Sequence, residues 1–295
     1  MNNSAALLPV LALLVNALTW GVSWWPFRWL EGQGLHALWA TALVYAASVL
    51  VIVLWRPGAP GLLWRSPRLW WLILASGTTN AAFNWAVTLG DVVRVVLLFY
   101  LMPLWAVLLA RLLLGERLSA AAAWRVALAL AGAMIVLWPA QASGAGAWPV
   151  PRSLADWLGI IGGFSFALNN VLLRREAAAP QEARALAMFV GGVLVSVILG
   201  SGLLAAGRIA PPTLLNGQWL MGAALLALAF LLGNLCLQYG AARLPANTTA
   251  AVMIAEVLFA SASAVALGAA VLTPQLLLGG ALIVAASLLA AWRGG

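Results

Sequence analysis

The sequence is dominated by a succession of apolar runs of about 20 residues each, separated by short polar connections. A helix of about 20 residues spans the hydrocarbon core of a bilayer, whereas a membrane strand needs only about ten. Backbone groups inside lipid must bond within the protein, which leaves helices or a closed barrel. Because the runs are long and do not alternate, they favour helices. Ten runs are expected, over 7–29, 36–54, 70–90, 93–113, 123–139, 154–174, 185–206, 218–239, 246–270 and 275–292.

The composition agrees with a membrane location and excludes other classes of protein. The 295 residues are 65% hydrophobic and 7% charged, with a mean hydropathy of +1.03, whereas a soluble domain carries about 25% charged residues. The single His36 excludes a multi-histidine metal site, and the single Cys236 excludes an intrachain disulfide. The chain has no Lys, so it has no phosphate-binding loop, and it lacks metalloprotease and serine-hydrolase motifs. Neither an enzymatic activity nor a cofactor is expected.

The arginines predict the orientation of the chain in the membrane. They stand between apolar runs, which is typical of a topology signal and not of a nucleic-acid-binding patch. Eleven of the 15 follow even-numbered runs or lie at the C-terminus, whereas four lie in the other loops: Arg28, Arg94, Arg152 and Arg208. Both termini are therefore expected in the cytoplasm, and the first run is expected to be a spanning helix of the cytoplasmic membrane, not a removable signal peptide. Tryptophans near the run ends fit an interfacial belt: Trp55, Trp70, Trp71, Trp124, Trp138, Trp157, Trp219 and Trp292.

The two halves of the chain resemble each other at polar positions. With an offset of 154 residues, Asn80 falls on Asn234 and Asn84 falls on Gln238. Five runs per half is an odd number, so the second half enters the membrane from the opposite side. We therefore expect two inverted five-helix repeats with a binding site between them near the bilayer midplane. The repeats are residues 1–139 and 154–295.

Polar side chains at helical spacing indicate which runs face inward. They form stripes on the first, third, sixth, eighth and ninth runs, and the fourth run adds Tyr100. A central cavity lined by these runs would have aromatic walls with a few amides, which suits a flat, partly polar solute. Interhelical hydrogen bonding is the alternative role for such residues. The candidate substrate-binding residues are Trp20, Ser23, Trp24, Asn80, Phe83, Asn84, Tyr100, Phe166, Asn169, Gln238 and Glu256.

Glu256 is the most unusual of these candidates, because it stands in the otherwise apolar stretch VMIAEVLFASA, residues 252–262. A bare charge at the bilayer centre costs roughly 2.5–3.5 kcal/mol on insertion scales, so an intramembrane acid indicates function. Glu256 would either hold a substrate ammonium group or carry a proton. The alternative is a neutral carboxylic acid bonded to backbone or to an amide. Pro103, in the middle of the fourth run, would let that helix bend as a gate.

Two stretches and the duplicated ten-helix layout carry a resemblance to a known family. LTWGVSWWPFRWLE in the first run and LLLGERLS after the fourth are similar to the drug/metabolite transporter superfamily of the EamA type. Within it, the Trp-rich first run resembles the aromatic amino-acid exporters. The family often carries Glu-Pro in runs four and nine. Here Met102-Pro103 and Glu256-Val257 divide that pair at matching repeat positions.

The resemblance implies export of aromatic amino acids and related compounds across an inner membrane, through a cavity lined by both halves. The sequence thus predicts an all-α membrane exporter of small amphipathic metabolites that works by alternating access, secondary-active or facilitative. Two alternatives stay open, a passive pore and a membrane sensor that binds its ligand without moving it. A monomer and a homodimer are both compatible with the small-residue faces of the fifth and tenth runs.

Overall fold

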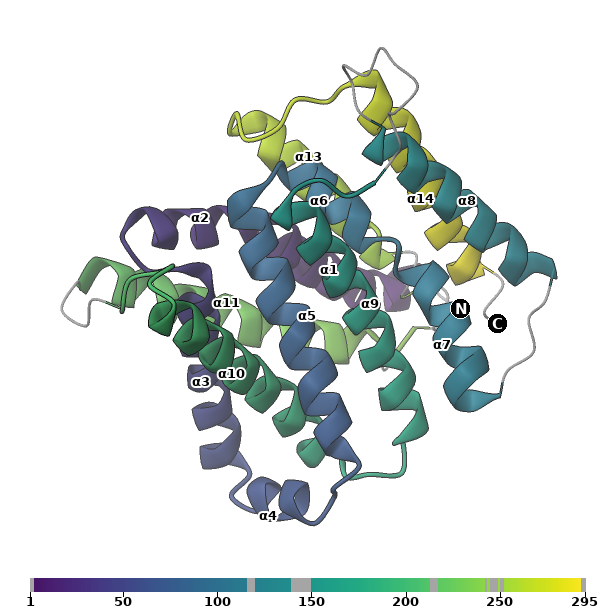
Figure 1. The fold of residues 1–295 in the computed structure, drawn as a ribbon. Coiled ribbons are helices and arrows are strands. Elements are labelled where there is room, and N and C mark those ends of the chain that lie inside the picture. Colours follow the sequence, from purple (N-terminus) through teal and green to yellow (C-terminus); the bar gives the residue numbers. More distant parts are fainter. Residues whose placement is uncertain are drawn as a thin grey trace.

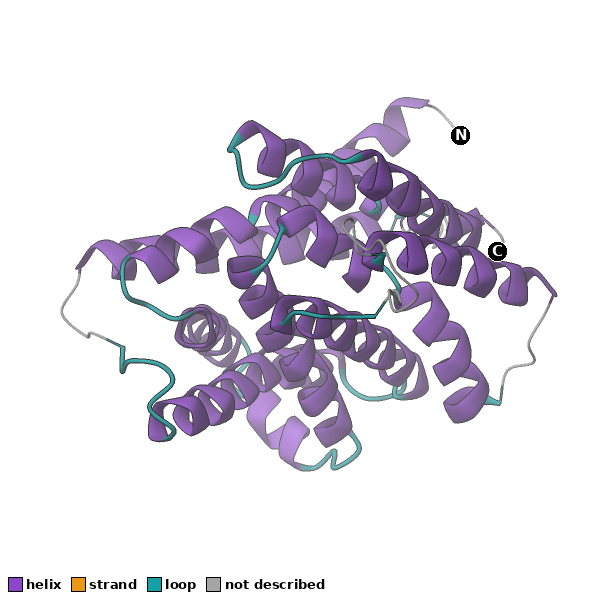
Figure 2. Ribbon diagram, turned by 45° about the horizontal axis from the view of Figure 1, so that its top comes forward, coloured by secondary structure: helices purple, strands orange, loops and turns teal. Residues whose placement is uncertain are grey.

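Helices account for the regular structure of the computed structural model, and the described residues contain no strand (Figures 1 and 2). The structure describes residues 3–115, 120–138, 150–212, 217–241, 243–244, 249 and 252–292. In chain order the helices are α1 (Asn3–Val22), α2 (Trp24–Gly32), α3 (Ala37–Trp55), α4 (Ala59–Trp64), α5 (Leu69–Leu89), α6 (Val92–Phe99), α7 (Met102–Leu114), α8 (Ala120–Leu137), α9 (Leu154–Arg175), α10 (Gln181–Ala205), α11 (Gly217–Ala241), α13 (Ala255–Ala266) and α14 (Pro274–Trp292).

Local sequence signals account for several of the helix ends. The Asp91 side chain caps α6 by accepting a bond from the Arg94 N–H at 2.8 Å. Ser153 and Asp156 form a reciprocal capping box at the start of α9. Gly115 ends α7 with a φ of +69°, a left-handed conformation that glycine adopts without steric cost. The helical class predicted from the sequence is confirmed.

Judged by length and hydropathy, fewer helices could span a membrane than the ten that the sequence predicts. Among the described residues, six segments are long and apolar enough to cross a membrane: Leu7–Gly32, Ala37–Trp55, Val92–Leu114, Leu154–Arg175, Gln181–Ala205 and Trp219–Leu237. Helix α5 is long enough, but its Ser, Thr and Asn residues lower its hydropathy. The apolar parts of α8, α13 and α14 are shorter, at Ala123–Leu137, Ala255–Ala266 and Pro274–Leu289. Ten spans and cytoplasmic termini therefore stay predictions.

The exposed surface of the described residues is rich in large apolar side chains, as expected of a lipid-facing surface. Most of the tryptophans predicted to form an interfacial belt are exposed: Trp55, Trp70, Trp71, Trp124, Trp138 and Trp157. Trp219 differs, because it is buried with Phe27 and Leu30 in a core between α2 and α11. The side chain of Trp292 lies outside the described residues.

Helices from the two halves of the chain pack mainly against each other. In Figure 1, α5 lies in the middle of the molecule with α9 and α10 on either side of it. Helix α1 packs along α11, α3 packs along α10, and α8 packs along α14. Neighbours in sequence, such as α3 and α5, make a less extensive contact. The centre of the molecule is therefore built by both halves.

Glycines allow the closest of these helix contacts. A Cβ atom on Gly77 of α5 would lie 2.6 Å from the Gly191 carbonyl carbon of α10 and closer still to its oxygen. A Cβ atom on Gly191 would likewise overlap the Ile73 carbonyl oxygen. The Ser76 hydroxyl donates to the Met188 carbonyl oxygen at 3.0 Å across the same contact. Small residues at such crossings let two membrane helices approach backbone to backbone.

We expect Gly191→Ala to lower the free energy of unfolding by about 1–3 kcal/mol, because the added methyl group meets backbone that cannot rotate away. Gly202→Ala is the matched control on the same helix, since a Cβ atom there meets nothing within 4 Å. Alanine favours the helix more than glycine, so this control should be neutral or slightly stabilising. The measurement is thermal unfolding of the purified protein in detergent. Equal midpoints for the two variants would contradict the close crossing.

Candidate functional site

Two helices are broken inside the predicted fourth and ninth spans, and the breaks occupy matching repeat positions. The fourth span is divided at Tyr100 and Leu101, between α6 and α7. The ninth has a turn at Ile254 directly before α13. The offset of 154 residues places Tyr100 on Ile254. Broken membrane helices at corresponding positions of two repeats are typical of transporter binding sites.

The two breaks have different local causes. In the fourth span, Pro103 has no N–H to bond the Phe99 carbonyl four residues before it, and the Leu101 N–H bonds the Leu98 carbonyl at 3.2 Å instead. The ninth span has Val257 at the proline position. Its N–H bonds the Ile254 carbonyl, three residues back, at 3.0 Å. Such a tight turn releases the Met253 carbonyl, which a regular α-helix would have used.

The two breaks are in contact through the phenol of Tyr100 and the carboxylate of Glu256. The buried Tyr100 hydroxyl lies 3.3 Å from the Met253 carbonyl oxygen and 3.3 Å from Oε2 of Glu256, so it can donate to either acceptor. Glu256 stands in the first turn of α13, where unpaired backbone N–H groups favour a negative charge. A hydrogen-bond donor and a helix N-terminus thus offset part of the cost of placing a carboxylate in this apolar stretch.

Helix α1 covers this meeting point. Asn16 is 1% exposed, and its amide nitrogen donates to the Met253 sulfur at 3.5 Å. Its amide oxygen Oδ1 is buried and has no hydrogen-bond partner. Gly21 lets α1 approach α13 closely, since a Cβ atom there would lie 2.7 Å from the Glu256 carbonyl oxygen. Asn16 was not among the predicted binding residues, although it lies on the polar stripe of the first run.

The first span is itself interrupted, at Ser23, and this places its two tryptophans in different surroundings. The Ser23 hydroxyl donates to the Trp20 carbonyl oxygen at 2.7 Å, a back-bond that bends helices. The Trp20 ring stacks on Phe230 of α11, with ring centres 4.5 Å apart. The Trp24 ring nitrogen instead donates to the Ser263 hydroxyl of α13 at 2.9 Å. Only Trp24 therefore lies in the same apolar core as Tyr100.

The other predicted aromatics lie beside the break of the fourth span. Phe83 meets Phe99 at 4.9 Å between ring centres, and Phe99 meets Phe166 at 5.4 Å. Phe99 links the two predicted residues but was missed as a candidate, because no polar stripe marks its run. Pro103 is buried at the start of α7. Phe83, Tyr100 and Phe166 are thus brought together, whereas Trp20 is not.

The predicted amides on α5 face α3, whose run carries no predicted polar stripe. Asn80 accepts a bond from the Tyr45 hydroxyl at 2.5 Å and donates to the Ser76 carbonyl oxygen at 2.8 Å. Asn84 is fully buried and donates to the Thr41 hydroxyl at 3.1 Å. Polar residues on the second run could have indicated this pairing. In this conformation both amides serve helix packing, and Oδ1 of Asn84 has no partner.

Asn169 of α9 is also buried, and its Oδ1 has no hydrogen-bond partner. The neighbouring Asn170 is exposed, so the two amides point to different sides of the helix. The side chain of Gln238 and the whole of Glu116, the acid of LLLGERLS, lie outside the described residues. Buried polar groups without partners are rare in folded proteins. The unpaired oxygens of Asn16, Asn84 and Asn169 are therefore acceptors available to a ligand.

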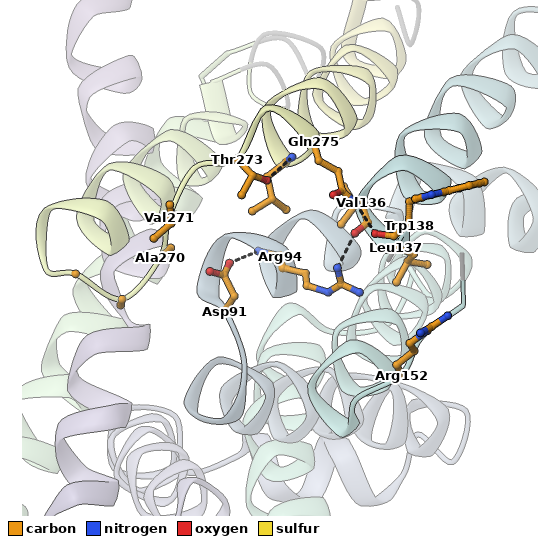
Figure 3. Close-up of a pocket in the computed structure, with 13 residues that line it drawn as sticks. Asp91, Arg94, Val136, Leu137, Trp138, Arg152, Ala270, Val271, Thr273 and Gln275 are labelled. Atoms are coloured by element: carbon orange, nitrogen blue, oxygen red, sulfur yellow. Dashed lines mark hydrogen bonds between the residues drawn. The ribbon is translucent and has the colours of Figure 1, made fainter. Parts of the chain in front are cut away.

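A separate pocket of about 500 Å³ opens at one end of the bundle (Figure 3). Its lining contains none of the predicted binding residues; it consists of Asp91, Arg94, Val136, Leu137, Trp138, Arg152, Gly268, Ala269, Ala270, Val271, Thr273, Gln275 and Leu276. Gln275 donates to the Ile135 carbonyl at 2.7 Å and to the Trp138 carbonyl at 2.5 Å, so α14 is tied to the end of α8. The pocket thus lies over a cross-linked end of the bundle.

Arg94 is the centre of that cross-link. Its Nε lies 2.7 Å from Oδ1 of Asp156 and its Nη2 lies 3.0 Å from Oδ2, a bidentate pair between α6 and α9. Its Nη1 donates to the Val136 carbonyl at the end of α8, at 2.6 Å (Figure 3). From the sequence, Arg94 was expected only as a loop charge, and Asp156 was not singled out. The Ser-x-x-Asp capping box at Ser153 was a readable signal that Asp156 belongs to a helix start.

Arg28 makes a similar connection nearby. Its Nε donates to the Val87 carbonyl at 2.8 Å, and its Nη2 donates to the Gly90 carbonyl. These carbonyls lie at the C-terminal end of α5, where a cation is favoured. The guanidinium also lies 5.3 Å from the centre of the Trp24 ring. Two of the four arginines in the sparsely charged loops thus bind helix ends.

The first half of the sequence matches a known family. Residues 7–138 fit the model of the EamA-like transporter family. The match covers somewhat less than half of the 295-residue chain. The EamA-like family consists of membrane transporters and not of enzymes, and the apolar helices agree with a multi-pass membrane protein.

A solved structure resembles the fold of nearly the whole chain. A crystal structure with 20% sequence identity superposes with a TM-score of 0.55, over 98% of this chain and 96% of the other. Identity this low concerns the fold alone. Comparison of the sequence with curated proteins gives no match. The match of residues 7–138 thus agrees with a membrane transporter of small metabolites, without naming the substrate.

Proposed function

We propose that the protein exports small amphipathic metabolites, with aromatic amino acids as the substrate class, across the cytoplasmic membrane by alternating access. The observation that carries the proposal is the meeting of two broken helices at matching repeat positions, with Glu256 and Tyr100 between them. Secondary transporters bind substrates at such breaks near the bilayer midplane. The substrate class is supported by the resemblance of the first run and by the aromatic rings beside the break.

The pairing of helices supports the two inverted repeats that this mechanism needs. Helix α5 packs on α9, and its repeat counterpart α11 packs on α1, the counterpart of α9. In the same way α7 packs on α9 while α13 packs on α1. An exchange of partners of this kind is what a two-fold relation between residues 1–139 and 154–295 requires. The central site would then lie on the axis that relates them.

The proposed roles follow from the chemistry of the side chains. Phe83, Tyr100 and Phe166 would enclose the apolar part of the substrate, and Glu256 would hold its ammonium group. Oδ1 of Asn169 is a further acceptor for that ammonium group. Because Phe83, Tyr100 and Asn169 are buried here, substrate could reach them only after one end of the bundle opens. That requirement favours a carrier over a passive pore.

Counterflow in proteoliposomes tests the proposal. We expect a radiolabelled aromatic amino acid to enter faster when unlabelled substrate is present inside, which a passive pore does not show. Glu256→Gln should slow this exchange by about tenfold or more, as for the loss of a charge-assisted hydrogen bond. Absence of acceleration by internal substrate would overturn the carrier mechanism, and an unchanged rate for Glu256→Gln would remove that residue from the site.

Variants of adjacent residues that point to different sides of a helix test which helix faces line the site. Asn169→Ala should lower counterflow several-fold, because it removes a buried acceptor, whereas Asn170→Ala should leave the rate unchanged. Trp24 and Trp25 form a second pair, with 3% and 51% of each residue exposed. Trp24→Ala should impair exchange and Trp25→Ala should not. If the inward and outward members of each pair behave alike, the site has been placed on the wrong helix faces.

A further inference from the structure

Unpaired oxygen atoms occur on α1 and on the ninth span, the two segments that meet at the helix break. Oδ1 of Asn16 has no partner, although the residue is 1% exposed and its amide nitrogen reaches the Met253 sulfur at 3.5 Å. Oγ1 of Thr249, four residues before Met253, is also buried and unpaired. An unsatisfied buried polar group costs about 1–3 kcal/mol. The one on Asn16, whose side chain contacts Met253 at the helix break, calls for a ligand that contacts oxygen.

The break itself supplies two more oxygen ligands. The Met253 carbonyl is released from the helix, because the Val257 N–H bonds the Ile254 carbonyl. Met253 O and the Glu256 carboxylate then share the single proton of the Tyr100 hydroxyl, at 3.3 Å each. That hydroxyl can satisfy one acceptor at a time. At least one of these oxygens is therefore left with capacity for a cation.

The kinds of ligand present indicate which cation would bind. An amide oxygen, a backbone carbonyl and one carboxylate are hard oxygen donors, which bind alkali and alkaline-earth ions and not soft metals. The described residues hold no cluster of three His, Cys, Asp or Glu side chains, as a tight divalent site would need. A proton would satisfy one oxygen of Glu256 and leave Asn16 unpaired. A monovalent ion neutralises the single carboxylate and contacts several oxygens at once.

We propose that Asn16, the Met253 carbonyl and Glu256 form a binding site for Na⁺ at the contact of α1 with the broken ninth span. Unwound backbone carbonyls bind Na⁺ in other transporters with broken helices. Gly21 brings α1 against the Glu256 backbone, so the ion would tie the first helix of one half to the break of the other. Coupling of this ion to export rests on the proposed function, whereas binding of the ion does not.

Thermal unfolding of the purified protein in NaCl, KCl and choline chloride at equal ionic strength tests the site. NaCl should raise the midpoint by about 5 °C with saturation, since a ligand that binds only the folded state stabilises it. Asn16→Leu should fold, because it removes an unpaired amide, but should lose the Na⁺ response. Asn16→Asp keeps the oxygen ligands and should retain it. Thr19→Val, on the same helix, should respond as the wild type does, because Thr19 bonds its own helix at the Val15 carbonyl.

Three results would overturn the site: equal midpoints in NaCl and choline chloride, an equal rise in KCl, or a Na⁺ response that survives Asn16→Leu. Counterflow with and without Na⁺ separates this inference from the proposed function. A Na⁺-dependent midpoint without counterflow would reject export and leave the ion site standing. Counterflow with no Na⁺ effect on the midpoint would reject the ion site and leave the carrier.

Discussion

Asp156→Asn is expected to lower the free energy of unfolding by about 3 kcal/mol. Breaking a buried ion pair costs roughly 3–5 kcal/mol because the remaining charge is left unpaired. The Asp156 side chain is 4% exposed and that of Arg94 is 27% exposed, so the lower end of this range applies. Asn keeps the size of the side chain and an acceptor for the Ser153 N–H, so the loss reports on Arg94. The midpoint of thermal unfolding in detergent measures it.

Asp91→Asn is the control for this variant, because it removes another carboxylate that contacts Arg94, at the backbone N–H and not at the guanidinium group. Asp91 caps α6 through the Arg94 N–H, and Asn is as good an N-cap as Asp. Its midpoint should therefore stay close to that of the wild type. Arg94→Gln should lose about as much stability as Asp156→Asn, and the double variant should lose less than the sum of the two. Additive losses would contradict the direct pair.

Gly163→Ala is expected to abolish counterflow and to lower the free energy of unfolding by roughly 3 kcal/mol, the upper end for overpacking. A Cβ atom there would lie 3.0 Å from the Phe99 carbonyl carbon and closer still to its oxygen. That carbonyl is the one left without a helical partner by Pro103. Relieving the overlap would displace the break and move Tyr100 from Glu256. Counterflow and thermal unfolding together measure the effect.

Two other glycines of α9 provide a graded comparison. A Cβ atom on Gly159 would lie 3.2 Å from the Val95 carbonyl oxygen, and one on Gly162 would lie 3.2 Å from the Phe99 ring. Both neighbours need to give way by only a few tenths of an ångström, and the ring can do so by rotation. Gly159→Ala and Gly162→Ala should therefore keep most of the exchange rate. Three equal effects along the helix would mean that the break is not specially sensitive.

Periodicity and length were enough to predict the helices, because lipid forces the backbone to bond locally. They were not enough to predict where helices break. Pro103 indicates the break in the fourth span, but the ninth span breaks at Ile254 with Val257 in the proline position. That turn is accompanied by tertiary contacts with Tyr100 and α1. No residue type in the ninth span predicts the turn from the sequence. Tyr100 and Glu256 were both predicted as site residues, and they lie in contact.

The parts of the site that could not be predicted depend on which helices meet. Trp20 and Trp24 are four residues apart, which places them on one face of a continuous helix. The interruption at Ser23 separates them, so each contacts a different helix. Asn80 was expected to face the cavity, but its oxygen meets Tyr45 of α3. The periodicity of one segment does not predict which of several neighbouring helices a side chain will contact.

The interleaving of the two halves has a consequence for synthesis of the protein. Helices α1, α3, α5 and α8 find their main partners among α9, α10, α11 and α14, which the ribosome makes later. The early segments must therefore stay in the lipid with Ser76 and Gly77 of α5 lacking their partners on α10, until translation passes the midpoint of the chain. The nascent first half is then the most vulnerable species to quality-control proteolysis, and slow elongation beyond residue 154 would prolong that risk.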